Sequence, residues 1–210
     1  NHPRFQDSST FDLLQFNPQD GLAHASPEEL GFPADTDLND FNFDAIEVFN
    51  GVGDEELFEQ LEDWYALLNL GYVIAAAAGG DSHDLKAYPG NPRNYLFVGE
   101  DDPSALTVEM VNDAVRARRV LETSGPYVEA GLIDEETGAP SLPGELVSDE
   151  DGLLDLWVKI QAPTWMEVTQ LTLIRNGNVE QVMEIDDPGD PLLRTVERLD
   201  VLLPVQADSD

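Results

Sequence analysis

Apolar residues recur with two different periods along the chain, and the change between them divides it in two. From residue 43 to about 121, short apolar runs alternate with segments of 3.6-residue period, which is typical of strands alternating with helices. After a stretch rich in Pro and Gly at 140–144, apolar and polar residues alternate strictly, as in half-buried antiparallel strands. We therefore predict an α/β unit over 1–135 and a small β domain over 140–210.

The α/β unit is predicted to contain three strands and two main helices. Its first 40 residues are irregular, apart from a short helix expected to start near Ser26. Buried strands are predicted at 43–49, 72–78 and 95–98, and helices at 54–69 and after Thr107. We expect Gly71 to end the first of these helices. The apolar positions that predict inward helix faces are Leu57, Phe58, Leu61, Trp64, Tyr65 and Leu68 in the first helix, and Val108, Val111, Val115 and Leu121 around the second.

The β domain is predicted to be sandwich-like. Alternating runs occur at 153–161, 168–174, 179–185 and 199–205. Asn176-Gly177, between the second and third runs, is a strong signal for a two-residue hairpin turn. These patterns favour a small antiparallel β-sandwich.

Charge and composition then exclude several classes of partner. The chain has 10 Lys+Arg against 43 Asp+Glu, a formal net charge of −33, so we expect no binding to nucleic acid or to an anionic membrane. The acidic residues are spread along the whole chain, which favours a solvated surface or adaptation to salt. With no cysteine, the chain has neither disulfides nor thiolate metal ligands. The longest apolar run is too short to cross a membrane as a helix.

Asp81 and His83 are the strongest candidates for chemistry. They follow the apolar run at 72–78, and residues two apart on a strand share a face, so both side chains could bind one cation. Oxygen and nitrogen ligands suit Zn²⁺, Mn²⁺ or Fe. The alternative is an Asp that caps the following turn beside an exposed His, and the spacing leaves both interpretations open.

Further polar residues could join this site. His2 precedes Pro3, which restricts its backbone to extended conformations and suits a fixed ligand, although a chain terminus is often mobile. Glu47 lies mid-strand, where a buried carboxylate is costly unless it is paired or bound to metal. Asn50, at the end of that strand, would point into the same opening.

Four other polar residues and one further histidine have less specific sequence signals. Arg93 could clamp a phosphate or carboxylate, or could form a structural ion pair. Asp12, Asp44 and Asp84 could hydrogen-bond to the residues of the site without binding the metal, but no spacing singles them out. His24 lies in a polar loop and is predicted to be a surface histidine.

Several motifs together resemble the PHP (polymerase and histidinol phosphatase) superfamily of metallohydrolases, and most of all its carbaryl-hydrolase-like branch. The residues that carry the resemblance are Asn1-His2-Pro3, Ile46-Glu47-Val48-Phe49-Asn50-Gly51, Gly80-Asp81-Ser82-His83, Pro92-Arg93 and Thr123-Ser124-Gly125-Pro126. The resemblance implies a distorted seven-stranded β/α barrel with two or three divalent metals at its mouth, followed by a β-sandwich.

The resemblance also implies roles for single residues. His2, Asp81 and His83 would be metal ligands, Glu47 and Asn50 would line the pocket, and Arg93 would face the substrate. Glu47 and Arg93 would then belong to the catalytic machinery, with metal-activated water attacking a small-molecule phosphoester or related ester.

The chain departs from the family pattern at its beginning. The His-x-His pair with which family members open does not occur, and only about 130 residues precede the linker, whereas such a barrel needs roughly 200–250. We therefore expect a C-terminal portion of a hydrolase with an incomplete metal site, completed by the missing N-terminal half or by a second copy. The alternative is a non-catalytic binding module made of a barrel remnant and a β-sandwich.

Overall fold

The structure is a computed structural model of residues 1–210. It describes all residues except 1, 6, 52–53, 84, 86–87, 134–136, 148–152, 164, 186–192, 197–200 and 205–210. The elements in chain order are α1 (Thr10–Leu14), β1 (Phe16–Asn17), β2 (Leu22–Ala23), β3 (Ala45–Asn50), α2 (Asp54–Asn69), β4 (Ala75–Gly79), β5 (Arg93–Leu96), α3 (Val108–Arg116), β6 (Val120–Thr123), β7 (Tyr127–Leu132), β8 (Leu153–Pro163), β9 (Gln170–Arg175), β10 (Asn178–Glu184), β11 (Leu193–Val196) and β12 (Val201–Pro204).

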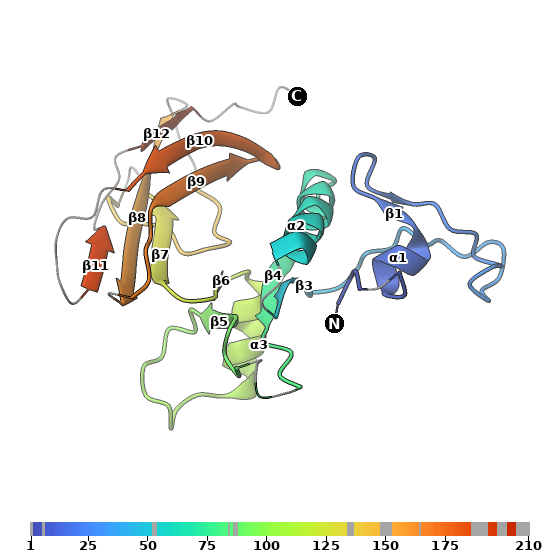
Figure 1. Ribbon diagram of the computed structural model, residues 1–210, viewed down its shortest axis with the longest axis horizontal. Helices are drawn as coiled ribbons and strands as arrows, with labels where there is room; N and C mark the ends of the chain where they lie inside the picture. Colours follow the sequence, from blue (N-terminus) through green and yellow to red (C-terminus); the bar gives the residue numbers. More distant parts are fainter. Residues whose placement is uncertain are drawn as a thin grey trace.

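The centre of the first part is a parallel pair of strands packed against a helix. β3 and β4 pair in parallel, from Ala45 opposite Ala75 to Asn50 opposite Gly79, and α2 connects them. In Figure 1, α2 stands between the N-terminal region with α1 and β1 and the sheets of the C-terminal region. The main apolar core joins α1, β1, β3, α2 and β4 and consists of Phe11, Phe16, Phe41, Ile46, Val48, Ala66, Leu67, Ile74 and Ala76.

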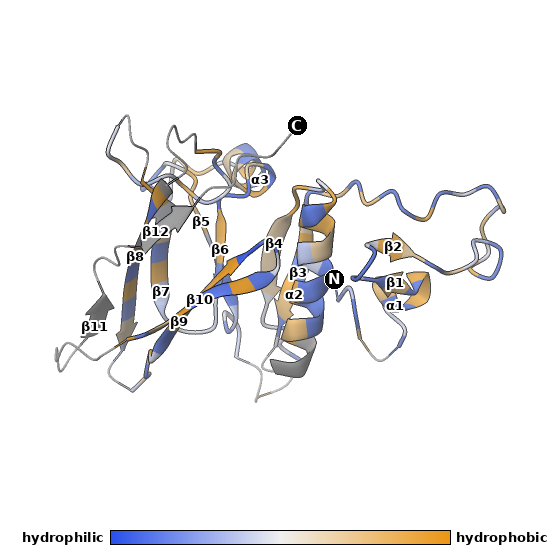
Figure 2. Cartoon of the chain, turned by 90° about the horizontal axis from the view of Figure 1, so that it is seen from above, coloured by the Kyte–Doolittle hydropathy of each residue, from blue (hydrophilic) through white to orange (hydrophobic). Residues whose placement is uncertain are grey.

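Helix α2 has the predicted bounds but presents a different face to the interior. Phe58, expected inside, is 65% exposed, whereas the polar residues Gln60 and Asp63 are fully buried beside Leu67. Apolar and polar stripes both run along this helix (Figure 2). The predicted face was therefore wrong in part, because an apolar period alone does not reveal a polar residue that has a buried partner.

The end of α2 follows the sequence prediction, but the start of the next strand does not. Gly71 has a φ of 90° and lies just after the helix, as expected of a C-terminal stop. The amide of Tyr72 donates to Leu67 O at 3.0 Å, so the chain is still leaving the helix at that point. β4 accordingly begins at Ala75 and not at residue 72. Likewise, residues 27–31 form turns and not the short helix predicted near Ser26.

The next two strands are antiparallel to each other. β5 pairs with β6, from Arg93 opposite Thr123 to Leu96 opposite Val120. The expected third strand at 95–98 therefore exists but begins two residues earlier, and β6 was missed. The part of the chain that the structure describes contains helices and strands in several small sheets, mostly antiparallel, and forms no closed barrel.

Helix α3 begins where the sequence predicts. Thr107 is its N-cap, and its side chain accepts a hydrogen bond from Met110 N at 3.2 Å. Its inward face differs from the prediction, since Val108 is 71% exposed and Ala114 is the buried residue. A nine-residue helix offers few inward positions, so a small shift in its docking angle changes which residues are covered.

The C-terminal region is built on the long strand β8. β7 pairs antiparallel along one edge of β8, while β11 and β12 pair with successive stretches of the other edge. β7 lies in the range predicted for the α/β unit, so the strand pairing crosses the expected boundary. β9 and β10 form a separate hairpin whose turn residues, Asn176 and Gly177, have φ values of 51° and 77°, as its sequence predicts.

Among the residues that the structure describes, no helix combines the length and the apolar character needed to span a bilayer.

Candidate functional site

The candidate site lies where β3 and β4 end. Asn50 and Gly79 are opposite each other there, and Gly51 N donates to Gly79 O at 2.9 Å. Glu47 lies three residues before Asn50 on β3, and its side chain is 15% exposed. Its Oε1 accepts a hydrogen bond of 3.2 Å from Asn50 Nδ2. The strand ends thus orient a carboxylate that is largely shielded from solvent.

His2 brings the N-terminal segment to these strand ends. Its Nδ1 lies 3.3 Å from Glu47 Oε2, and its Nε2 lies 3.7 Å from Asp81 Oδ2. Asp81 also contacts His83, whose Nε2 lies 2.7 Å from Asp81 Oδ1. Glu47, His2, Asp81 and His83 therefore form a continuous chain of alternating carboxylates and imidazoles, called here the His2–Asp81 cluster.

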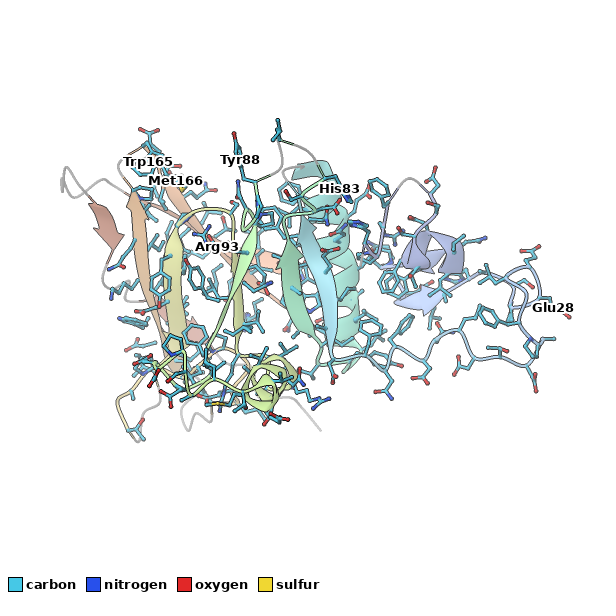
Figure 3. The ribbon with its side chains drawn as sticks, turned by 90° about the horizontal axis from the view of Figure 1, so that it is seen from below. Glu28, His83, Tyr88, Arg93, Trp165 and Met166 are labelled. Carbon is cyan, nitrogen blue, oxygen red and sulfur yellow. The ribbon has the colours of Figure 1, made fainter. Side chains whose placement is uncertain are left out.

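Asp81 and His83 meet in a way that the sequence did not suggest. β4 ends at Gly79, so both residues follow the strand and do not share one of its faces. Asp81 instead has a φ of 41°, in the left-handed region, and the turn folds His83 back onto it. His83 is 81% exposed at the end of the strands, where Figure 3 shows it on the same side as Tyr88.

The donors fit a divalent metal by type but meet only in pairs. Two ligands about 2.1 Å from a tetrahedral metal lie roughly 3.4 Å apart, close to the 3.7 Å between His2 Nε2 and Asp81 Oδ2. However, within the described ranges no three His, Asp or Glu side chains are arranged to hold a metal ion together. The cluster can therefore supply part of a coordination sphere with oxygen and nitrogen ligands, and other donors would have to complete it.

Arg93 is not part of this cluster. Its Nη1 donates to Gly90 O at 3.2 Å, its Nη2 donates to Gly125 O at 2.9 Å, and its Nε lies 3.2 Å from Tyr95 Oη. The guanidinium also stacks 5.4 Å from the centre of the Tyr95 ring. It lies on β5, on the side of His83 that faces the C-terminal strands (Figure 3). These contacts join two loops through backbone carbonyls, and neither a carboxylate of the cluster nor the predicted ion-pair partner is among the contacts of Arg93 with described residues.

The remaining polar candidates contact residues outside the cluster, except Asp84, which is not among the described residues. Asp12 accepts hydrogen bonds from Phe5 N and Ser9 N at 3.0 and 3.2 Å, and so helps to start α1. Asp44 forms an exposed pair with Arg116 at 3.4 Å. His24 is on the surface, as predicted, and pairs with Asp20 at 2.9 Å. Asp84 lies outside the described residues.

The apolar pattern of the sequence does not predict the ion pair between Arg4 and Asp63, which lies beside the cluster. Asp63 on α2 is fully buried, and its two oxygens accept hydrogen bonds from Arg4 Nε and Nη2 at 2.5 and 2.8 Å. Burial raises the pKa of Asp63, against the opposing effect of the Arg4 hydrogen bonds, while the hydrogen bond to Asp63 raises the pKa of Arg4. The available signal was a rare cation two residues after His2.

Comparisons with models of protein families, with curated proteins and with solved structures gave no match.

Proposed function

We propose that this chain supplies one side of the active site of a metal-dependent hydrolase resembling the PHP superfamily. The observation that carries the proposal is the position of His2. It comes from the start of the chain, yet its imidazole lies between Glu47 on β3 and Asp81 after β4. A histidine between two carboxylates at the ends of parallel strands is a suitable arrangement for binding a divalent cation.

The fold is consistent with part of a β/α barrel. In the proposed parent protein, the parallel pair β3–β4, with α2 as its connection, is one barrel unit, and β5, α3 and β6 continue the wall. The β7–β8 sheet and the β9–β10 hairpin would belong to the following β-sandwich. Among the described residues β3 pairs only with β4. In the proposed parent protein its other edge would pair with a further part of the barrel or with a second copy, which would also supply further metal ligands.

Each residue of the cluster has a distinct part in the proposed site. His2, Asp81 and His83 hold the metal, of which the family site contains two or three, with Zn²⁺, Mn²⁺ or Fe as candidates. Glu47, fixed by Asn50, lines the pocket and can accept a proton from water. A bound metal would lower the pKa of water and stabilise negative charge on an ester or phosphoester substrate.

A second candidate is a non-catalytic binding module. It is favoured by the pairwise contacts of the cluster, since no three donors converge among the described residues. The two candidates differ in whether the cluster binds a divalent cation specifically.

Metal binding by the purified chain tests the proposal. The chain would be titrated with Zn²⁺ and with Mn²⁺ by calorimetry, and its metal content measured after dialysis. We expect specific binding that Asp81→Asn weakens by about tenfold or more. An amide has no negative charge and rarely replaces a carboxylate that binds a metal or orients one of its ligands. Hydrolysis of 4-nitrophenyl phosphate would then be assayed in the parent protein.

Asp20→Asn is the matched control. Asp20 forms an Asp–His pair of similar geometry with His24, away from the strand ends, and nonspecific binding to the acidic surface would treat the two pairs alike. If Asp81→Asn and Asp20→Asn have equal effects, or the wild-type chain holds neither metal, the hydrolase proposal fails and the binding module remains.

A further inference from the structure

The segment that carries His2 is attached to helix α2 by a buried ion pair. Arg4 donates two hydrogen bonds to Asp63, of 2.5 Å from Nε and 2.8 Å from Nη2. This two-point contact fixes the plane of the guanidinium as well as its distance from the carboxylate. Arg4 Nη2 also donates to Phe16 O at 2.8 Å, which ties the same side chain to β1.

The backbone around Arg4 is held on its other side by the start of α1. Pro3 O accepts a hydrogen bond of 2.8 Å from Phe11 N, and Phe5 N donates to Asp12 Oδ2 at 3.0 Å. The rings of His2 and Phe5 lie 5.3 Å apart. Residues on both sides of Arg4 are therefore fixed, and His2 is only two residues from the ion pair.

A buried ion pair is a poor source of stability, because removing two charges from water costs about as much as their attraction returns. An apolar pair of similar size would fill the same space at no loss of stability. What the ion pair adds is a defined geometry, because residues 2–5 belong to no helix or strand that would fix their path. The geometry that it defines here is the path of residues 2–5.

We propose that Arg4 and Asp63 are positioning residues, which hold the 2–5 segment on α2 so that the His2 imidazole reaches Glu47 and Asp81. Asp63 touches neither carboxylate of the cluster and acts only through Arg4 and the backbone. The importance of this position for metal binding rests on the proposed function, but the position of His2 itself can be measured without a metal.

Chemical labelling of histidine measures the position directly. Diethyl pyrocarbonate acylates accessible imidazoles, and mass spectrometry resolves His2 from the other histidines. Free N-acetylhistidine added to every sample serves as the reference, because His24 follows Ala23, the strand partner of Phe16, and so lies close to a contact of Arg4. In Arg4→Lys, which keeps the charge but cannot form the two-point contact, we expect the His2 rate relative to this reference to rise about tenfold, the effect of losing one charged hydrogen bond.

Two further variants separate positioning from stability. Thr107→Ala removes the N-cap of α3, far along the chain from His2, and lowers stability without touching the segment. Arg4→Met/Asp63→Leu replaces the ion pair with apolar side chains, and we expect it to fold as stably as the wild type yet to label rapidly at His2. It also serves in place of Arg4→Lys if that variant does not fold.

The labelling outcomes decide the proposal in both directions. Faster labelling of His2 in the Arg4 variants, with no change in Thr107→Ala, supports it. Unchanged labelling in the Arg4 variants overturns it, and so does an equal increase in Thr107→Ala, because the effect would then follow lost stability alone.

Metal titration of the same variants links the positioning role to the site. We expect Arg4→Lys to weaken Zn²⁺ binding about tenfold in the wild-type background and to have no effect in a His2→Ala background. A wild-type chain that binds no metal refutes the proposed function, and the labelling result still decides whether Arg4 and Asp63 position His2.

Discussion

Gly79 lies so close to the Glu47 carboxylate that a Cβ at position 79 would overlap Glu47 Oε1. The two residues are on adjacent strands, where β3 and β4 end. Glycine at this position therefore leaves the space in which Glu47 accepts its hydrogen bond from Asn50. The close approach depends on the absence of a side chain and not on an unusual backbone conformation.

We expect Gly79→Ala to displace the Glu47 carboxylate from Asn50 and to lower the free energy of unfolding by about 0.5–1.5 kcal/mol, the effect of losing one hydrogen bond, because the colliding Oε1 is the end of a flexible side chain. Urea denaturation measures the loss. The control is the same substitution in a Glu47→Ala background, where the colliding atoms are gone and the loss should be much smaller. Equal losses in the two backgrounds would contradict the contact.

Arg93 gives a second prediction, because its donors are used by Gly90 O and Gly125 O. Lysine has a compact ammonium group that cannot reach both carbonyls, so Arg93→Lys should lower the free energy of unfolding by about 1–2 kcal/mol. Arg116→Lys is the control, since Arg116 forms one exposed ion pair and should cost less than about 0.5 kcal/mol. If both cost equally little, Arg93 is not needed by the loops and its predicted role toward substrate gains weight.

Glu122 gives a prediction about pH. It lines a cavity of about 360 Å³ with Trp64 and Arg118, and its Oε1 is buried without a hydrogen-bond partner among the described residues. Burial raises the pKa of Glu122. Because the folded-state pKa exceeds the unfolded value near 4.5, the contribution to stability is full below that value and is lost as the pH rises through the folded-state pKa.

Glu122→Gln should therefore be more stable than the wild type at pH 7, by on the order of 1 kcal/mol, because it removes a charge that burial disfavours. The advantage should disappear toward pH 4, where the wild-type carboxyl is protonated. Melting temperatures measured from pH 4 to pH 8 would show this. Glu62→Gln, at an exposed position of α2, should show no such trend, and a constant difference at Glu122 would refute the assignment.

The net charge of −33 predicts a dependence on salt. Repulsion among the acidic residues is screened as the Debye length falls from about 10 Å at 0.1 M salt to about 3 Å at 1 M. The melting temperature should therefore rise over this range. Sodium chloride and potassium chloride should act alike, because screening depends on ionic strength. A fall in melting temperature, or a large difference between the two salts, would be inconsistent with screening.

The predictions from sequence are most accurate where interactions between residues close in the chain decide the structure. The bounds of α2, the start of α3 after Thr107, the glycine after α2 and the Asn176-Gly177 turn all follow from residues within a few positions of one another. Capping and turn formation depend on short-range hydrogen bonds and on allowed φ values, so the sequence contains the information directly.

The candidate site was predictable as a set of residues but not as a geometry. The pattern singled out His2, Glu47, Asp81 and His83, and the structure brings these four together, but Asp81 and His83 meet through a left-handed turn and not through a strand face. Arg93, considered with them, contacts other loops. The metal, the substrate class and the family resemblance stay predictions.

By itself, the sequence determined the local elements, the acidic surface and the residue types available for chemistry. Only the tertiary structure decided that β7 pairs with β8 across the expected boundary, that α2 buries Asp63, and that Arg4 binds it. These features depend on partners far apart in the chain. Apolar periodicity cannot reveal them, because a buried polar residue is tolerated only when a distant residue satisfies it.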